Sequence, residues 1–363
     1  MLVAHDFAEA FGGAERVCGE LGDLFATSTL WTIAGRDSVV ERMGFTEHRS
    51  LLPSRGWILR HYRALTPIYP ALVRARDLPD ADLLVTSSYA FANGFRTRNR
   101  APHLCYCHSP LRFAWSMTEG YGANLRGGAP ARVALRALAA SMRTLDRRAA
   151  QRVTRFVANS RYVAEQLLRF YGVTAEVVHP PVDCSTFRPG AVEHEGFFLY
   201  CGRLIEPYKK PTLVVEAFRD LPHRLLVAGD GPELEKLKRI ATPNVDFLGS
   251  LPTDELVSLM QRCAAAILPS HDDFGMVPVE AMACGRPVLA YAGGGALETV
   301  VPGLSGDLFG EQSAEALRSA VEGFDPGAYD PRAIRAHAER FGVERFRSEI
   351  ASIAAEIMDA AAT

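Results

Sequence analysis

The stretch AAILPSHDDFGMVPVEAMACGRPVLA, residues 265–290, contains an apolar run, a polar loop, a helical segment and a second apolar run. The two apolar runs, 265–270 and 287 onward, have the length and composition of buried strands. Pro278 suits the first turn of a helix that Gly285 terminates, which places Glu280 in that first turn. A strand followed by a helix and a second strand is typical of a parallel sheet covered by helices.

The same alternation recurs on both sides of this stretch. The segment 175–196 is rich in proline and glycine, and a fresh alternation starts after it, so we place a domain boundary there. The sequence predicts an α/β fold with an N-terminal domain over 1–187 and a C-terminal domain over 195–345. Ligands of two such domains are expected at the carboxyl ends of the strands. The strand-like runs are 1–5, 81–88, 103–109, 155–160, 197–202, 223–231, 245–250, 265–270 and 287–295.

The composition of the 363 residues supports two buried cores, since 48% of them are hydrophobic. A net charge of -2 argues against a general nucleic-acid binder. No apolar run approaches the length of a spanning helix, and the first residues lack the basic region of a signal peptide. Seven cysteines without a CxxC pair indicate reduced thiols, so we expect a cytoplasmic protein.

Two carboxylates, Asp272 and Glu280, flank the pair Phe274-Gly275 in the loop after the strand at 265–270. Near a helix N-terminus such acids are either capping partners or ligand groups. The glycine favours the second interpretation, because it permits close backbone approach to a ligand. Arg203 and Lys209, in the loop after the strand at 197–202, add cations. A nucleoside diphosphate sugar needs both sets, since its hydroxyls donate to carboxylates and its phosphates bind cations and amides.

Six motifs, taken together and in this order, resemble the retaining glycosyltransferases of family 4, which have the GT-B fold. The resemblance runs from Met1 to about Ser305 and implies two Rossmann-like domains facing each other across a cleft. The segment CHSPLRFAW, 107–115, also resembles a subgroup that transfers mannose or related sugars. The motifs are Gly12 to Arg16, Cys107 to Pro110, Gly202-Arg203 with Lys209, Gly229 to Pro232, the Asp272-x7-Glu280 frame and Glu280 to Gly285.

The resemblance implies a role for each matching residue. Arg203 and Lys209, beside Gly202, would bind the donor diphosphate, and Glu280 would bind the ribose hydroxyls. The donor sugar would be held by Asp272, by the amides of Phe274, Gly275 and Met276, and from the first domain by His108. Gly12 and Gly13 would let the first helix approach the phosphates and the acceptor.

One residue departs from the family pattern, because the family usually has glutamate at the position of Asp272. Aspartate is shorter by one methylene. Three consequences are open: the loop moves in, Asp273 substitutes, or the contact with the sugar changes.

The predicted activity is retaining hexosyl transfer, with GDP-mannose as the first donor and a glycan or lipid-linked acceptor of cell-envelope or exopolysaccharide synthesis. No cofactor and no metal ion are expected, because cations and amide dipoles can stabilise the leaving diphosphate. Two alternatives are an epimerase of the same fold and a catalytically silent subunit that binds a nucleotide sugar.

Two further segments carry predictions about neighbours. The segment 54–76 mixes five arginines with aromatic residues, and it is interpreted equally well as a solvated helix face or as a peripheral contact with an anionic membrane at the inner face of the cell membrane. The final segment is helical in pattern, and the family resemblance implies that 346–363 packs back on the first domain.

Overall fold

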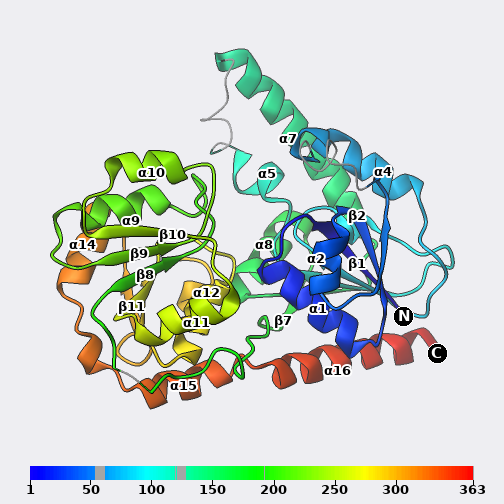
Figure 1. The fold of residues 1–363 in the computed structure, drawn as a ribbon. Helices are drawn as coiled ribbons and strands as arrows, with labels where there is room; N and C mark the ends of the chain where they lie inside the picture. Colours follow the sequence, from blue (N-terminus) through cyan, green and yellow to red (C-terminus); the bar gives the residue numbers. More distant parts are fainter. Residues whose placement is uncertain (54–61, 119, 121–127, 192, 363) are drawn as a thin grey trace. The chain divides into compact units, whose positions relative to one another are not determined.

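The computed structural model describes residues 1–53, 62–118, 120, 128–191 and 193–362 (Figure 1). The chain forms two compact units, which we describe separately. Unit 1 consists of Met1–His179 and Phe346–Thr363, and unit 2 of Pro180–Arg345. The helices of the described residues include none that is long and apolar enough to cross a membrane.

Unit 1 is built on a parallel sheet, which has seven strands among the described residues. The strand order β3-β2-β1-β4-β5-β6-β7 reverses direction between β1 and β4, as in a Rossmann fold. The carboxyl ends of β1 and β4 therefore flank the position where such folds bind ligands. The strands are β1 (Leu2–Ala8), β2 (Thr29–Gly35), β3 (Glu47–Ser50), β4 (Leu84–Ser88), β5 (His103–Cys107), β6 (Arg155–Ala158) and β7 (Ala175–Val177).

Helices cover both faces of this sheet, so its central strands are buried on both sides. On one face lie α1 (Gly13–Leu24), α2 (Asp37–Arg42) and α16 (Val343–Ala362). On the other lie α4 (Tyr69–Ala75), α5 (Arg112–Trp115), α7 (Gly128–Ala150) and α8 (Arg161–Tyr171). The described residues of this unit also form two 3-10 helices, η1 (Tyr62–Ile68) and η2 (Ala92–Gly94).

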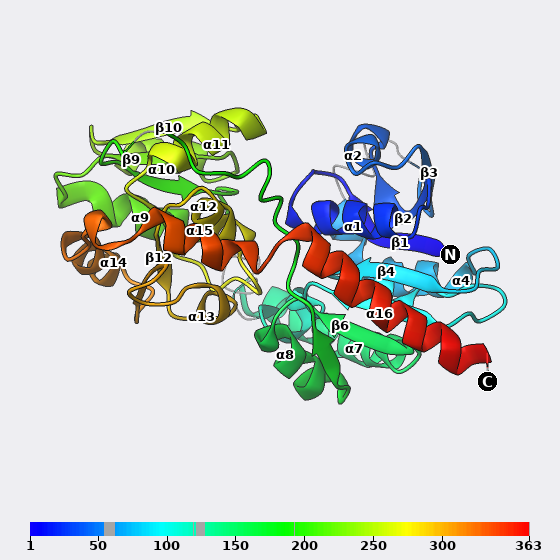
Figure 2. The same cartoon turned by 90° about the horizontal axis from the view of Figure 1, so that it is seen from below.

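Helix α16 runs along the sheet of unit 1, far from the rest of that unit in sequence (Figure 2). Its buried side chains recur at helical spacing, at Phe346, Ile350, Ile353 and Ile357, and pack against the central strands. Arg347 adds ion pairs to Glu20 and Asp23 of α1. This last helix therefore completes the core of the unit that the first residues begin.

Unit 2 repeats the architecture with a parallel sheet that has six strands among its described residues, in the order β10-β9-β8-β11-β12-β13. Here the order reverses between β8 and β11. The strands are β8 (Phe198–Cys201), β9 (Leu225–Ala228), β10 (Val245–Gly249), β11 (Ala265–Leu268), β12 (Val288–Tyr291) and β13 (Gly306–Phe309).

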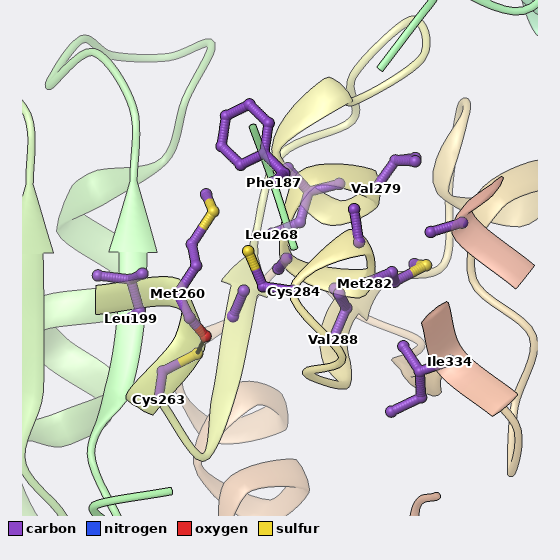
Figure 3. Close-up of a cluster of buried hydrophobic side chains, with 14 of the residues drawn as sticks. Phe187, Leu199, Met260, Cys263, Leu268, Val279, Met282, Cys284, Val288 and Ile334 are labelled. Carbon is purple, nitrogen blue, oxygen red and sulfur yellow. Dashed lines mark hydrogen bonds between the residues drawn. The ribbon is translucent and has the colours of Figure 1, made fainter. Parts of the chain in front are cut away.

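Alternate side chains of these strands enter two different cores. Leu199 of β8 faces the core shown in Figure 3, whereas Phe198 and Tyr200 face the opposite core. The first core contains α11 (Thr253–Arg262), α12 (Met276–Ala283) and α15 (Pro331–Glu339), and α13 (Ala296–Thr299) contributes Ala296. The second contains α9 (Pro211–Ala217), α10 (Leu234–Ile240) and α14 (Ala314–Glu322). Two 3-10 helices, η3 (Phe218–Asp220) and η4 (Pro326–Ala328), complete the unit.

The structure corrects two details of the predicted organisation. Unit 2 begins at Pro180, earlier than the predicted boundary, because Val182 and Phe187 already belong to its core and the Val182 amide donates to the Phe341 carbonyl. Helix α12 begins at Met276, because Gly275 turns the chain with a left-handed conformation (φ 85°). Glu280 therefore lies beyond the first turn of this helix.

Candidate active site

Two loops of unit 2 meet at the point where the strand order reverses, between β8 and β11. Gly202 and Arg203 directly follow β8, and the loop 269–275 follows the neighbouring strand β11. The predicted donor-binding residues of unit 2 are all located in these loops or in α12, which follows the second loop. They are Gly202, Arg203, Lys209, Asp272, Asp273, Phe274, Gly275, Met276 and Glu280.

The loop that carries Arg203 and Lys209 is held by a tyrosine from within the core. The hydroxyl group of Tyr200 lies 3.4 Å from the Arg203 carbonyl oxygen and 3.3 Å from the Lys209 carbonyl oxygen, and it shares its hydrogen between them. Burial, with a smaller contribution from Asp272, raises the pKa of Tyr200 far above its ordinary value. The hydroxyl therefore stays a donor, and it fixes both ends of the cationic loop.

The motif Gly229 to Pro232 supports the same loop through its glycines. A Cβ atom at Gly229 would lie 1.9 Å from the Gly202 carbonyl oxygen, and one at Gly231 would lie 2.3 Å from the Leu204 carbonyl oxygen. Real atoms cannot approach this closely, so both positions require glycine. The Leu204 amide also donates to the Asp230 carbonyl oxygen at 2.9 Å. This motif thus shapes the backbone beneath Arg203.

Lys209 and Asp272 form an ion pair that joins the two loops. The Lys209 ammonium donates to the Asp272 Oδ2 atom at 2.6 Å. The Asp272 side chain is only 9% exposed and that of Lys209 is 25% exposed, so the pair is poorly screened by water. An ammonium group has three hydrogens, and two of them are left for oxygen atoms of a ligand. The shorter aspartate therefore reaches the cationic loop in this protein.

The loop 269–275 packs on three consecutive glycines, 293–295. The Gly295 amide donates to the Asp272 carbonyl oxygen at 2.9 Å. A Cβ atom at Gly294 would lie 2.1 Å from that same oxygen, and one at Gly295 would lie 2.3 Å from the Phe274 backbone. Phe274 is buried against Phe341. The position of Asp272 is thus fixed from behind by backbone contacts.

The remaining predicted residues of unit 2 differ in exposure. Arg203 is exposed, as a residue that meets a ligand from solution would be. Asp273 and Glu280 are buried, with 7% and 2% of their surface accessible. Burial of a carboxylate is costly unless hydrogen bonds or charges compensate it.

In unit 1, polar side chains of β1 and β4 lie close to His108, which directly follows β5. His5 of β1 lies opposite Ser87 of β4 in the sheet register, and the His5 Nδ1 atom is 3.0 Å from both the carbonyl oxygen and the hydroxyl oxygen of Ser87. The Ser87 hydroxyl is 2.8 Å from the Nε2 atom of His108. His108, predicted from the sequence, therefore belongs to a hydrogen-bonded chain with two residues that sequence reasoning missed.

Two further polar side chains fix the backbone around these hydrogen bonds, Asn159 directly after β6 and Asp6 within β1. The Asn159 amide group donates to the His108 carbonyl oxygen at 3.0 Å. The Asp6 carboxylate accepts four backbone N–H groups of residues 89–92, at 2.5 to 2.9 Å. The sequence offers one signal for these residues. A polar pair, His5-Asp6, interrupts the first strand, and three further polar pairs lie at or directly after the ends of β4, β5 and β6: Ser87-Ser88, His108-Ser109 and Asn159-Ser160.

The predicted glycines of unit 1 lie at the start of α1. Gly13 is its first residue and Gly12 precedes it without a side-chain cap. A Cβ atom at Gly12 would lie 3.1 Å from the Glu15 Oε2 atom, and the other oxygen of that carboxylate, Oε1, is 3.5 Å from the His5 Nε2 atom. These glycines therefore border the polar cluster that contains His5 and His108.

Two family models match consecutive parts of the chain. The model described as Glycosyltransferase Family 4 matches residues 11–186, and the model described as Glycosyl transferases group 1 matches residues 185–324. The chain belongs to glycosyltransferase family 4. The two matched regions meet close to the boundary between the units, so each unit of this family 4 chain corresponds to one of the two family domains.

Curated relatives match part of the family 4 chain. The D-inositol 3-phosphate glycosyltransferase 1 of Catenulispora acidiphila is 33% identical over 207 residues, which are 48% of this chain and 47% of that protein. The D-inositol 3-phosphate glycosyltransferase of Mycobacterium marinum is 32% identical over 222 residues, 52% of this chain and 47% of that protein. The chain thus spans about half the length of the curated relatives that it matches.

Solved structures show the fold of the whole family 4 chain. The Anabaena protein HepE in complex with UDP superposes with a TM-score of 0.72 at 19% identity and covers 98% of this chain and 100% of that one. Sucrose-phosphate synthase from Thermosynechococcus elongatus gives the same TM-score at 18% identity, with 99% and 100% covered. Together with the two parallel sheets, these similarities show the predicted GT-B fold.

Proposed function

We propose that this protein transfers a hexose from a nucleoside diphosphate sugar to a glycan or lipid-linked acceptor, with retention of anomeric configuration. The Lys209–Asp272 pair is the observation that carries this proposal. It places an ammonium group beside a carboxylate at the carboxyl edge of adjacent strands, where Rossmann-like sheets bind nucleotides. A diphosphate sugar needs the cation for its phosphates and the carboxylate for its hydroxyls.

Each residue of unit 2 then has a proposed role. Lys209 and Arg203 bind the diphosphate and stabilise the negative charge that develops on it as it leaves. Asp272 accepts a hydrogen bond from a sugar hydroxyl, and Glu280 accepts from the ribose hydroxyls. The backbone amides at 274–276 approach the sugar, and Asp273 supports the loop. In unit 1, His108 contacts the transferred hexose, and Gly12 and Gly13 leave room for phosphate and acceptor oxygens.

The proposed reaction needs neither a protein nucleophile nor a cofactor. The bond between the anomeric carbon and the phosphate oxygen breaks, and a bond from that carbon to the acceptor oxygen forms on the same face. The proton of the acceptor hydroxyl passes to the departing diphosphate. Cations and amide dipoles that are already in place supply the stabilisation, which is worth a few kcal/mol per group, about tenfold in rate for each 1.4 kcal/mol.

GDP-mannose is the donor that we propose first, because the segment 107–115 resembles the mannose-transferring subgroup. A UDP-hexose is the second candidate, because HepE, a protein of the same fold, has been solved with UDP and with UDP-glucose. We place the enzyme in the cytoplasm in cell-envelope or exopolysaccharide synthesis.

A peripheral contact with an anionic membrane through 54–76 is part of the proposal. Residues 54–61 of this segment lie outside the described residues, while Arg74 and Arg76 are exposed.

Thermal stabilisation by a panel of GDP-, UDP-, ADP- and TDP-sugars tests the donor site. A ligand at 100 times its dissociation constant adds about 2.7 kcal/mol of stability, so one nucleotide series should raise the melting temperature and the others should not. Lys209→Ala should reduce the shift at the same donor concentration. The absence of a shift with every donor would contradict the proposed site.

Turnover then separates transfer from the two alternatives. Transfer releases the nucleoside diphosphate only with an acceptor present, and the anomeric proton coupling of the product reports retention. An epimerase would convert the donor without an acceptor, and a silent binding subunit would bind it without release. Either result would contradict the proposed activity and leave the donor site intact.

A further inference from the structure

The polar chain of unit 1 contains one group that fixes the direction of its hydrogen bonds. The His5 Nδ1 atom lies 3.0 Å from the Ser87 carbonyl oxygen, and a carbonyl oxygen only accepts. His5 must therefore carry a hydrogen on Nδ1. The same N–H faces the Ser87 hydroxyl oxygen at 3.0 Å, so the hydroxyl accepts there as well.

The Ser87 hydroxyl has one hydrogen, and it cannot donate that hydrogen to a nitrogen that is itself a donor. Its other neighbour is the His108 Nε2 atom at 2.8 Å. If Nε2 carried a hydrogen, the Ser87 hydroxyl would accept at both contacts, and its own hydrogen would have no acceptor among the hydrogen bonds of the described residues. The hydroxyl therefore donates to Nε2, the unprotonated nitrogen of the His108 ring. In a neutral imidazole the hydrogen then resides on Nδ1.

The other ring nitrogen of His5, Nε2, supports the assignment of Ser87 as the donor to His108. This Nε2 atom is 3.5 Å from the Glu15 Oε1 atom, and both side chains are buried. Burial disfavours the imidazolium form, but the Cys18 sulfur and the Glu15 carboxylate outweigh it and raise the pKa of His5 well above its ordinary value. With both nitrogens protonated, His5 has no acceptor to offer to Ser87.

The surroundings of His108 favour its neutral form. Burial, and then the charges of His5 and Arg112, lower the pKa of His108 well below its ordinary value. Three further groups contact or adjoin the two rings, and none of the three is cationic: Tyr106 packs edge-on against His108, Tyr89 packs edge-on against His5, and the Asp6 carboxylate accepts four backbone N–H groups. The backbone of His108 is held by the Ser88 carbonyl oxygen and by Asn159.

We propose that His5 and Ser87 are positioning residues that hold His108 in the tautomer with its hydrogen on Nδ1, so that His108 serves its substrate as a hydrogen-bond donor. This inference rests on the proposed function, in which His108 contacts the transferred hexose. The acceptor of this bond is an oxygen of that sugar or of its phosphate. A neutral Nδ1–H cannot take up the acceptor proton, which agrees with its transfer to the diphosphate.

Nitrogen NMR of the histidine rings in the full-length enzyme tests the tautomer without any substrate. Comparison with His108→Gln and His5→Gln assigns the two signals. At pH 7 we expect His108 to show a protonated Nδ1 and an unprotonated Nε2, and His5 to show two protonated nitrogens. A protonated Nε2 on His108 would overturn the inference, and it would leave the donor-binding results unaffected.

Ser87→Ala tests the hydrogen bonds that connect His5 to His108. The His108 nitrogen signals should then show a mixture of both tautomers. The kcat should fall on the order of tenfold, because the loss of one hydrogen bond near a reacting group raises the activation free energy by about 1.4 kcal/mol. The dissociation constant for the donor nucleotide should not change.

Thr86→Val is the matched control, because the Thr86 hydroxyl bonds the His103 Nε2 atom at 2.7 Å on the same two strands, away from His108. Equal losses of kcat in Ser87→Ala and Thr86→Val would assign Ser87 a merely structural role.

Discussion

Lys209 and Lys210 are adjacent in the chain, but only one of them contacts a charged partner among the described residues. Lys209 pairs with the buried Asp272. Lys210 takes a left-handed conformation (φ 53°) and precedes the first turn of α9. The sequence alone could not separate two neighbouring lysines, because their difference depends on where the loop 269–275 lies in space.

Lys209→Ala should weaken donor binding by roughly tenfold to a hundredfold, because a hydrogen bond to a charged group contributes about 1.5–3 kcal/mol. Calorimetric titration with the donor measures it. Lys210→Ala is the control and should change the dissociation constant less than threefold, a negligible energy. Equal effects of the two substitutions would remove Lys209 from the donor site.

The candidate site was predictable only where its residues follow motifs. Spacing and resemblance predict Arg203, Lys209, Asp272 and Glu280 as site residues. His5 and Ser87 were missed, since they are 82 positions apart and meet only through the register between β1 and β4. Polar pairs within β1 and at the ends of β4, β5 and β6 were the one available signal, and recognising them as a cluster requires the strand order.

At the scale of elements, the glycines 293–295 form a platform on which the loop 269–275 rests. Gly294 has a left-handed conformation (φ 60°), as does Gly303 (φ 74°). The two differ in space: a Cβ atom at Gly303 would meet nothing within 4 Å, whereas one at Gly294 would collide with the Asp272 backbone.

Gly294→Ala should therefore lower stability and also weaken donor binding by at least tenfold. Gly303→Ala should cost only the left-handed strain of about 1 kcal/mol and leave binding unchanged. Chemical denaturation and donor titration of both variants separate the two effects. Normal donor affinity in a folded Gly294→Ala protein would show that the platform does not position Asp272.

A buried carboxylate joins four elements of unit 1. Asp146 of α7 accepts hydrogen bonds from Asn93, Trp115 and Tyr171, at 3.2, 2.8 and 2.6 Å. Burial raises the pKa of Asp146 to about 6, although these hydrogen bonds oppose the shift. The folded state therefore holds a proton on Asp146 at a pH where the unfolded chain has released it.

The free energy of unfolding should accordingly decrease as the pH rises from about 4 to about 6, with Asp146 contributing on the order of 2–3 kcal/mol to that decrease. Asp146→Asn removes this titration. Denaturant unfolding of both proteins at pH 4.5 and pH 7.5 isolates the effect, because all other carboxylates cancel in the difference. The variant should gain stability relative to wild type at the higher pH. An equal pH dependence of the two proteins would contradict the raised pKa.

The predicted elements agree with the structure where strands are apolar. The runs at 197–202, 223–231 and 265–270 correspond to β8, β9 and β11. Strand β3, with the sequence EHRS, lies at the sheet edge and is half exposed, so no hydrophobic period marks it. Helix α12 began earlier than predicted because the left-handed Gly275, and not Pro278, sets its start.

For the whole molecule, the division into units predicts that damage to one core leaves the other intact. Ile350 of α16 is fully buried in the core of unit 1. Ile350→Ala should destabilise unit 1 by about 2–5 kcal/mol, because it removes a buried side chain and leaves a cavity.

Donor titration and thermal unfolding of the Ile350→Ala protein check this independence. Nucleotide binding to unit 2 should persist at temperatures at which unit 1 has already unfolded. Ser352→Ala, on the exposed side of the same helix, is the control and should behave as wild type. Simultaneous loss of nucleotide binding and of unit 1 would show that the units unfold together.

The order in which the units occur along the chain has a consequence for biosynthesis. Unit 2 is one continuous segment whose ends are joined by the Val182–Phe341 hydrogen bond, and unit 1 is interrupted by it. On the ribosome, the first 179 residues emerge without α16, which lies beside α1 and α2 on one face of their sheet. Unit 2 can then fold completely while the part of the unit 1 core that α16 covers is still exposed to solvent. Domains usually fold in the order of their synthesis, but here unit 1, whose synthesis begins first, is the last to complete its fold.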